Sequence, residues 1–80
     1  MYVVVVHSIS NPDKFWNLSG FPDTIRLRES LPNAAGTRAV CLFEANSVEG
    51  VKDFLDEATR DASVNDYFAL AADKAVGLPS

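Results

Sequence analysis

The sequence predicts an α+β protein in which a four-stranded antiparallel sheet carries two helices on one face. Four segments have the composition or the apolar pattern of strands, and helix-like segments follow the first and the third of them. The two most apolar strand segments, residues 2–9 and 37–45, are also the first and the third in the chain. A βαββαβ order with right-handed crossovers places these two strands in the middle of the sheet. Residues 1–80 are therefore expected to form one domain.

The first strand and the first helix are expected within residues 2–20. "YVVVVHSI" consists almost entirely of residues that favour a pleated strand and disfavour a helix. "SNPDKFWNLSG" then has the features of a short helix, with Asn11 as N-cap, Pro12 at the first helical position and Gly20 as the stop. Its aromatic side is expected to anchor the helix to the sheet.

The middle of the chain predicts a strand pair. In "TIRLRES", residues 24–30, Ile25 and Leu27 alternate with Arg26 and Arg28, the period-two pattern of an edge strand with one wet face. "LPNAAG" brings Pro, Asn and Gly close together and is typical of a turn. The apolar run in "TRAVCLFEA" that follows indicates a central strand.

The second helix is expected in "NSVEGVKDFLDEATRDA", residues 46–62, because apolar residues recur at helical spacing against a charged face. Asn46 and Glu49 resemble a capping box, and Asp56 and Arg60 have the spacing of an ion pair on a helix. The last strand is expected in "VNDYFALAA", residues 64–72, although "ALAADKA" is also compatible with a helix.

The central strands have two apolar sides, whereas the helices cover only one face of the sheet. In the first strand Val3, Val5 and His7 lie on one side, and Val4 and Val6 lie on the other. An uncovered face of this kind exceeds the apolar patch of roughly 300–600 Å² that monomers usually expose. We therefore expect a homodimer that packs sheet to sheet.

Composition excludes several classes of partner. The formal net charge is -4 and the chain has only seven Lys and Arg residues, so neither nucleic acid nor an anionic membrane is an expected partner. The single cysteine cannot form an internal disulfide, and the N-terminus lacks the features of a secretory signal. A cytoplasmic location is expected.

The segment "GTRAVCLFEANSVEGV", residues 36–51, resembles the dimeric α/β-barrel superfamily. More narrowly, it is similar to small ferredoxin-like proteins in which a strand ending in "CLFEA" precedes an S-x-E-x-V helix. The resemblance implies a ferredoxin-like sandwich that pairs into a dimeric α/β barrel. It implies a broad range of activities, because members include cofactor-free oxygenases, haem-processing enzymes and isomerases, and some small relatives are described as nickel-binding. It carries over no catalytic residue.

His7 is the only histidine and the candidate catalytic residue. Histidine serves as a general base near neutral pH or as a metal ligand. A metal site needs several ligands, so we expect neither a metal nor a cofactor, and nickel or zinc binding is the alternative. A structural alternative is a partly buried histidine bonded to a backbone carbonyl or to water. The sequence leaves open which face of the sheet it occupies.

Three other residues are candidates for ligand binding. Arg26 can grip a carboxylate or can simply solvate the sheet edge, and Tyr67 can line an apolar cleft with a polar tip. Glu44, at a strand end, can act as an acid or base beside His7. Cys41 is expected in the core.

The sequence contains no motif that identifies a particular reaction. We expect an uncharacterised homodimer that binds a small molecule in an apolar cleft rimmed by His7, Arg26 and Tyr67. The enzymatic alternative is a cofactor-independent oxygenase or isomerase with His7 as base. An amino-acid-binding regulatory domain of βαββαβ type is a further possibility.

Overall fold

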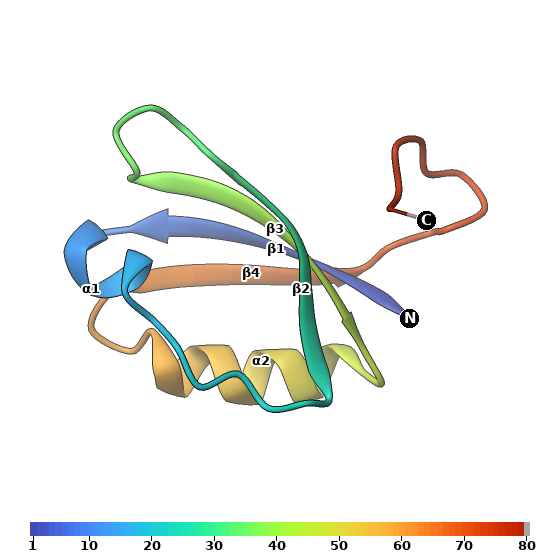
Figure 1. Cartoon of the computed structure of the whole chain (residues 1–80), viewed down its shortest axis with the longest axis horizontal. Coiled ribbons are helices and arrows are strands. Elements are labelled where there is room, and N and C mark those ends of the chain that lie inside the picture. The colour runs from blue at the N-terminus through green and yellow to red at the C-terminus, as the bar shows by residue number, and fades with distance from the viewer. Residues whose placement is uncertain (80) are drawn as a thin grey trace.

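The computed structural model describes residues 1–79, so Ser80, the last residue of the predicted domain, lies outside the described part. The elements are β1 (Tyr2–Ile9), α1 (Pro12–Trp16), β2 (Ile25–Pro32), β3 (Arg38–Ala45), α2 (Val48–Ala58) and β4 (Ser63–Ala69). All strand pairs are antiparallel, and the sheet order is β2-β3-β1-β4 (Figure 1). The predicted βαββαβ order and the central positions of the first and third strands are confirmed, and the topology is of the ferredoxin-like type.

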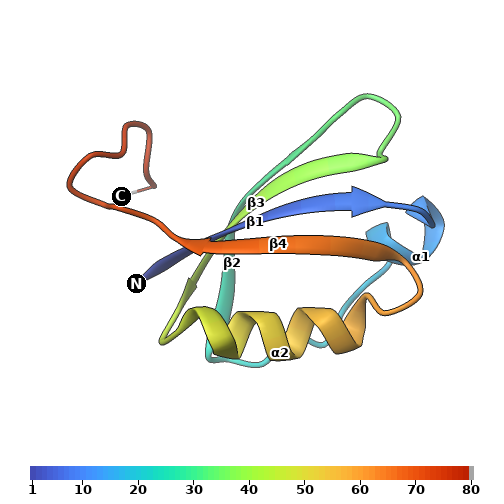
Figure 2. The same ribbon diagram turned by 180° about the vertical axis from the view of Figure 1, so that it is seen from behind.

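Both helices lie on the same side of the sheet. Phe15 of α1 and Leu55 of α2 are buried and line one cavity beneath the sheet. Helix α2 runs along the sheet, whereas α1 is a single turn at the end of β1 (Figures 1 and 2). The main core lies between α2 and the central strands, and its fully buried side chains include Val3, Val5 and Phe43.

The residue at which each helix begins is set by a side chain that caps its N-terminus. Asn11 caps α1 as predicted, because its side chain accepts a hydrogen bond from the Lys14 amide at 3.2 Å. The predicted cap of α2 at Asn46 is wrong. Ser47 is the N-cap, and its hydroxyl accepts from the Gly50 amide at 3.0 Å, which is the reach of a cap side chain to the third helical residue.

The predicted ion pair between Asp56 and Arg60 is also absent from the described residues. Asp56 pairs with Lys52 one turn earlier, and Arg60 lies 3.6 Å from Glu57. Asp56 has a second partner in Tyr67, which draws it toward the sheet. The carboxylate is therefore held by Lys52 of its own helix and by Tyr67 of the sheet, and not by Arg60.

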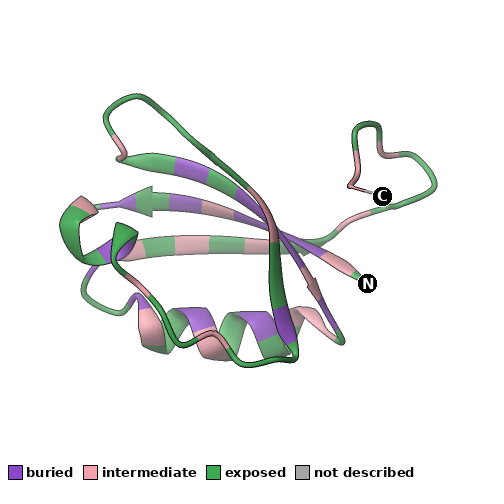
Figure 3. Ribbon diagram, viewed as in Figure 1, coloured by how far each residue is buried: buried purple, intermediate pink, exposed green. Residues whose placement is uncertain are grey.

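Strand β4 is shorter than predicted and exposes apolar side chains. It ends at Ala69, and the following residues form turns rather than the alternative helix. None of its residues is fully buried (Figure 3). Its polar residues Ser63 and Asn65 alternate with Val64 and Phe68, whose exposed fractions are 78% and 49%.

The face of the sheet opposite the helices is only partly covered. The tail after β4 forms a cavity of about 220 Å³ with this face, between Leu70 and Leu78 of the tail and Val4 and Leu42 of the central strands. Residue 1 and the tail after β4, residues 70–79, lie at the same end of the molecule (Figures 1 and 2). In residues 1–79 neither helix has the length and apolarity that a membrane crossing requires.

Candidate functional site

His7 lies in β1 on the helix-covered face and is 1% exposed. Strand register places it directly opposite Asn65 of β4. Its ring meets the edge of Phe15, with centroids 4.8 Å apart. The structure thus resolves which face His7 occupies, and it lies beneath the helices among core residues.

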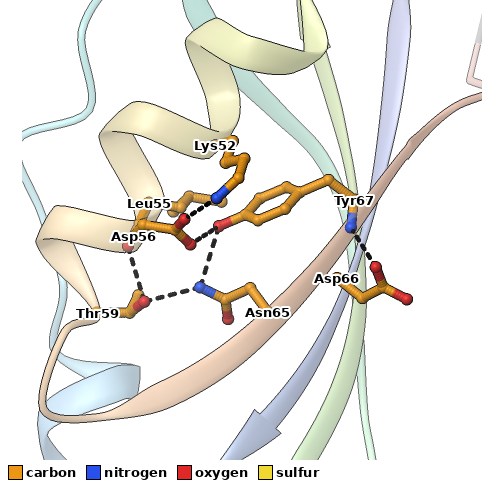
Figure 4. Close-up of polar contacts among 7 residues, drawn as sticks. All are labelled: Lys52, Leu55, Asp56, Thr59, Asn65, Asp66 and Tyr67. Atoms are coloured by element: carbon orange, nitrogen blue, oxygen red, sulfur yellow. Dashed lines mark hydrogen bonds and ion pairs between the residues drawn. The ribbon is translucent and has the colours of Figure 1, made fainter.

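A polar network joins His7 to the surface of α2. His7 Nδ1 lies 2.6 Å from Asn65 Oδ1, which also accepts a hydrogen bond from Ser63 Oγ at 2.7 Å. The amide nitrogen of Asn65 donates to Thr59 Oγ1 at 2.8 Å and to the Tyr67 hydroxyl at 3.1 Å (Figure 4). The partner of the histidine is therefore a side chain, not the backbone carbonyl or water considered from the sequence.

The network fixes the orientation of the Asn65 amide. The Thr59 hydroxyl donates to the Leu55 carbonyl at 2.7 Å, and the Tyr67 hydroxyl donates to the Asp56 carboxylate at 2.6 Å (Figure 4). Each hydroxyl has one proton, so both must accept from Asn65, and the amide nitrogen must face them. The amide oxygen consequently faces His7.

This orientation determines the tautomer of His7. An amide oxygen only accepts hydrogen bonds, so Nδ1 of His7 must carry the proton. In the neutral ring Nε2 then has a lone pair and acts as an acceptor. Nε2 is buried and has no hydrogen-bond partner within residues 1–79.

Burial and hydrogen bonds together set the protonation of the groups in the network. Desolvation lowers the pKa of His7, although its hydrogen bond to Asn65 opposes this shift. The hydrogen bonds from Lys52 and Tyr67 lower the pKa of Asp56, and burial together with the bond to Asp56 raises the pKa of Tyr67. The resulting state is a neutral imidazole, a neutral phenol and a carboxylate.

A cavity of about 160 Å³ extends from His7 toward β2 between the sheet and the helices. Its buried lining residues are His7, Phe15, Cys41, Phe43 and Leu55. Its mouth is formed by exposed residues of α1 and β2, namely Trp16, Leu27 and Ser30. The Trp16 indole is tied to the hairpin after β2, because it donates to the Gly36 carbonyl at 3.0 Å.

Nε2 of His7 lies on the side of the ring away from Asn65. Strands β4 and β3 flank β1 on opposite sides, and Nδ1 is turned toward Asn65 in β4. The cavity lies on the other side, against Cys41 and Phe43 of β3. A residue with a buried acceptor thus lines a cavity whose other deep walls are apolar, apart from the Cys41 thiol, which has a pKa raised by burial.

The other predicted site residues do not join His7 in one cleft. Arg26 and Glu44 are cross-strand neighbours on the opposite face of the sheet, and Glu44 pairs with Arg28 at 2.6 Å. Glu44 is therefore not beside His7. Tyr67 is on the same face as His7 but reaches it only through Asn65, on the side away from the cavity.

Asn65 is the central residue that sequence reasoning missed. The available signal was the alternation of Ser63, Asn65 and Tyr67 along one face of β4. Polar residues on the helix-covered face of a small protein must find partners there. The alternation alone does not say which partner each one finds.

The arrangement is suited to accepting a hydrogen bond or a proton from a molecule in the cavity. Metal binding has less support, because no group of three or more His, Cys, Asp or Glu side chains gathers as a metal site within residues 1–79. No protein-family model matches the chain, and no curated protein and no solved structure gives a significant match.

Proposed function

We propose that the protein binds a small, mainly apolar molecule in the cavity beneath the helices. The observation that carries this proposal is that His7 lines a cavity of about 160 Å³ and that its buried Nε2 has no hydrogen-bond partner within residues 1–79. A buried polar group without a partner costs about 1–3 kcal/mol, and a ligand that supplies the partner recovers this cost. The site therefore favours a ligand with one polar contact at His7.

The cavity volume sets the size of this ligand. An apolar protein cavity of roughly 150 Å³ is large enough to hold a benzene ring. The aromatic and aliphatic walls, including Phe15, Phe43 and Leu55, favour a ring of this kind. A single aromatic ring is thus the ligand class that we expect, with affinity on the order of 1 mM for a fragment of this size.

This proposal can be tested by filling the cavity. Phenol is titrated into the protein and binding is followed by the movement of amide signals in NMR spectra. Cys41→Met extends a side chain into the cavity, and Val40→Met, one residue earlier in β3, serves as the matched control on the opposite face. Cys41→Met should weaken phenol binding at least about tenfold, which corresponds to about 1.4 kcal/mol.

Val40→Met should bind phenol like the wild type. If both variants lost phenol affinity equally, or if a folded Cys41→Met protein still bound phenol, the ligand would have to lie outside this cavity. Absence of binding to the wild type at millimolar phenol, or of any shift at residues around His7, would contradict the proposal. Proton transfer by His7, as in an oxygenase or isomerase, requires the same placement of ligand, so binding is the property to measure first.

We further propose that a second copy of the chain covers the open face of the sheet, as in a dimeric α/β barrel. Exposed apolar residues gather there, with Leu31, Val40 and Val64 exposed to 61%, 39% and 78%. Arg38 and Asp66, both exposed, flank β1 on this face, so a two-fold axis can bring the arginine of one copy near the aspartate of the other. This apolar patch with complementary charges supports a sheet-to-sheet homodimer.

A further inference from the structure

We infer that Asn65 is a positioning residue that holds His7 as a hydrogen-bond acceptor and thereby makes the cavity selective for neutral hydrogen-bond donors such as phenols. The inference deepens the proposed function and rests on it for the ligand, but the state of the histidine can be measured alone. According to this inference, the Asn65 amide determines which nitrogen of the His7 ring carries the proton.

The contacts of Asn65 leave it one orientation. Its nitrogen meets two hydroxyls whose protons are already donated to the Leu55 carbonyl and the Asp56 carboxylate. Its oxygen meets a serine hydroxyl at 2.7 Å and the His7 ring at 2.6 Å. Rotating the amide by half a turn would set its nitrogen against the His7 Nδ1 proton and leave both hydroxyls without a donor.

The consequence for a ligand follows from the lone pair at Nε2. A phenol donates its O–H to this atom, whereas toluene has the same ring and no donor. A carboxylate or phenolate brings a charge into an apolar cavity and places a lone pair against a lone pair, which is unfavourable. We expect phenol to bind the wild type about tenfold more tightly than toluene, the effect of about one buried hydrogen bond.

The tautomer can be read directly by NMR because His7 is the only histidine in the chain. In the free protein, correlation of ring carbon-bound protons with ring nitrogens at pH 7.5 should give a protonated Nδ1 and an unprotonated Nε2. A protonated Nε2 in the wild type would overturn the inference, and this measurement requires no variant.

Two substitutions of Asn65 distinguish the effect of its hydrogen-bond acceptor from the effect of its packing. Asn65→Asp keeps an oxygen against His7 and should keep the Nδ1 proton. Asn65→Leu removes the acceptor, and the ring should shift toward protonation of Nε2, as free imidazole side chains prefer in water. The preference for phenol over toluene should fall to less than about threefold in Asn65→Leu. In Asn65→Asp the new carboxylate raises the pKa of His7, so that variant tests the Nδ1 proton and not the preference.

The outcomes distinguish the inference from the proposed function. If phenol and toluene bind the wild type equally, the cavity binds rings and the inference is wrong. If neither binds but Nδ1 carries the proton, the proposed function fails while the positioning role of Asn65 stands. An unchanged tautomer in a folded Asn65→Leu protein would refute the positioning role itself.

Discussion

At His7, burial in the core links the protonation of one side chain to the stability of the fold. The folded state holds the imidazole neutral, since desolvation lowers its pKa from the ordinary value of 6.5. The unfolded chain takes up a proton near that value. The stabilising difference is therefore complete above pH 6.5 and is lost as the pH falls from there through the lower pKa of the folded protein.

We predict that the free energy of unfolding of the wild type falls between pH 7.5 and pH 5, with a slope of up to about 1.4 kcal/mol per pH unit below 6.5. His7→Gln removes the titrating group and should flatten this part of the curve. Urea unfolding at several pH values measures the effect. Parallel curves for the two proteins would show that His7 is charged, or readily solvated, in the folded state.

The sequence was enough to identify His7 as a candidate, but it was not enough to identify the residue that bonds it. His7 was identifiable as a candidate because it is the only histidine and lies in an apolar strand. Its partner was not, because Asn65 is 58 positions away in the chain and meets it only through the register of β1 and β4. Cross-strand register depends on the whole sheet, so local pattern does not determine it.

At the start of α2, two neighbouring residues both have side chains that can cap a helix, and only one of them does so. Ser47 bonds the Gly50 amide, whereas Asn46 is exposed and was wrongly expected to be the cap. Both residue types favour an N-cap, and the sequence pattern "NS" does not distinguish them. The choice follows from where β3 ends and the chain turns toward the helix.

This difference gives a paired stability prediction. Ser47→Ala should lower the free energy of unfolding by about 1 kcal/mol, because an amide in the first turn of α2 loses its acceptor. Asn46→Ala, the control, should change it by less than about 0.5 kcal/mol, as exposed substitutions away from specific contacts do. Chemical denaturation of both variants checks the pair, and the reverse order of effects would return the cap to Asn46.

The element order and the central strands were predictable because each depends on short stretches of sequence. Helix α1 was recognisable from Asn11 and Pro12, β1 from its β-branched residues and β3 from its contiguous apolar run. The end of β4 was not, since residues 69–75 suit either a helix or a strand by composition. There the chain leaves the sheet and turns beside the open face instead.

For the molecule as a whole, the open face of the sheet is the surface on which large apolar side chains remain exposed to solvent. Val64, which is 78% exposed, projects from the edge strand β4 away from the helices. In an isolated protomer a charged residue there costs little, whereas in a sheet-to-sheet dimer it places an unpaired charge in an apolar interface. This contrast makes the residue a probe of assembly.

We predict that the wild type sediments as a dimer at micromolar concentration and that Val64→Asp sediments as a monomer. Leu27→Asp serves as the control, because Leu27 is 46% exposed on the helix-covered face, opposite the open face, and also exchanges an apolar side chain for a carboxylate. It should leave the dimer intact. A wild type that is monomeric at this concentration, or a Val64→Asp protein that remains dimeric, would contradict the sheet-to-sheet assembly.

The sequence by itself determined the βαββαβ order, the two central strands and the apolarity of both faces of the sheet. These properties depend on residue type and periodicity within single segments, which are local. Only the tertiary structure decided that His7 lies beneath the helices, that Asn65 holds its proton and that Arg26 and Glu44 lie on the other face. Such relations depend on strand register and on packing between distant segments, so they exist only once the chain has folded.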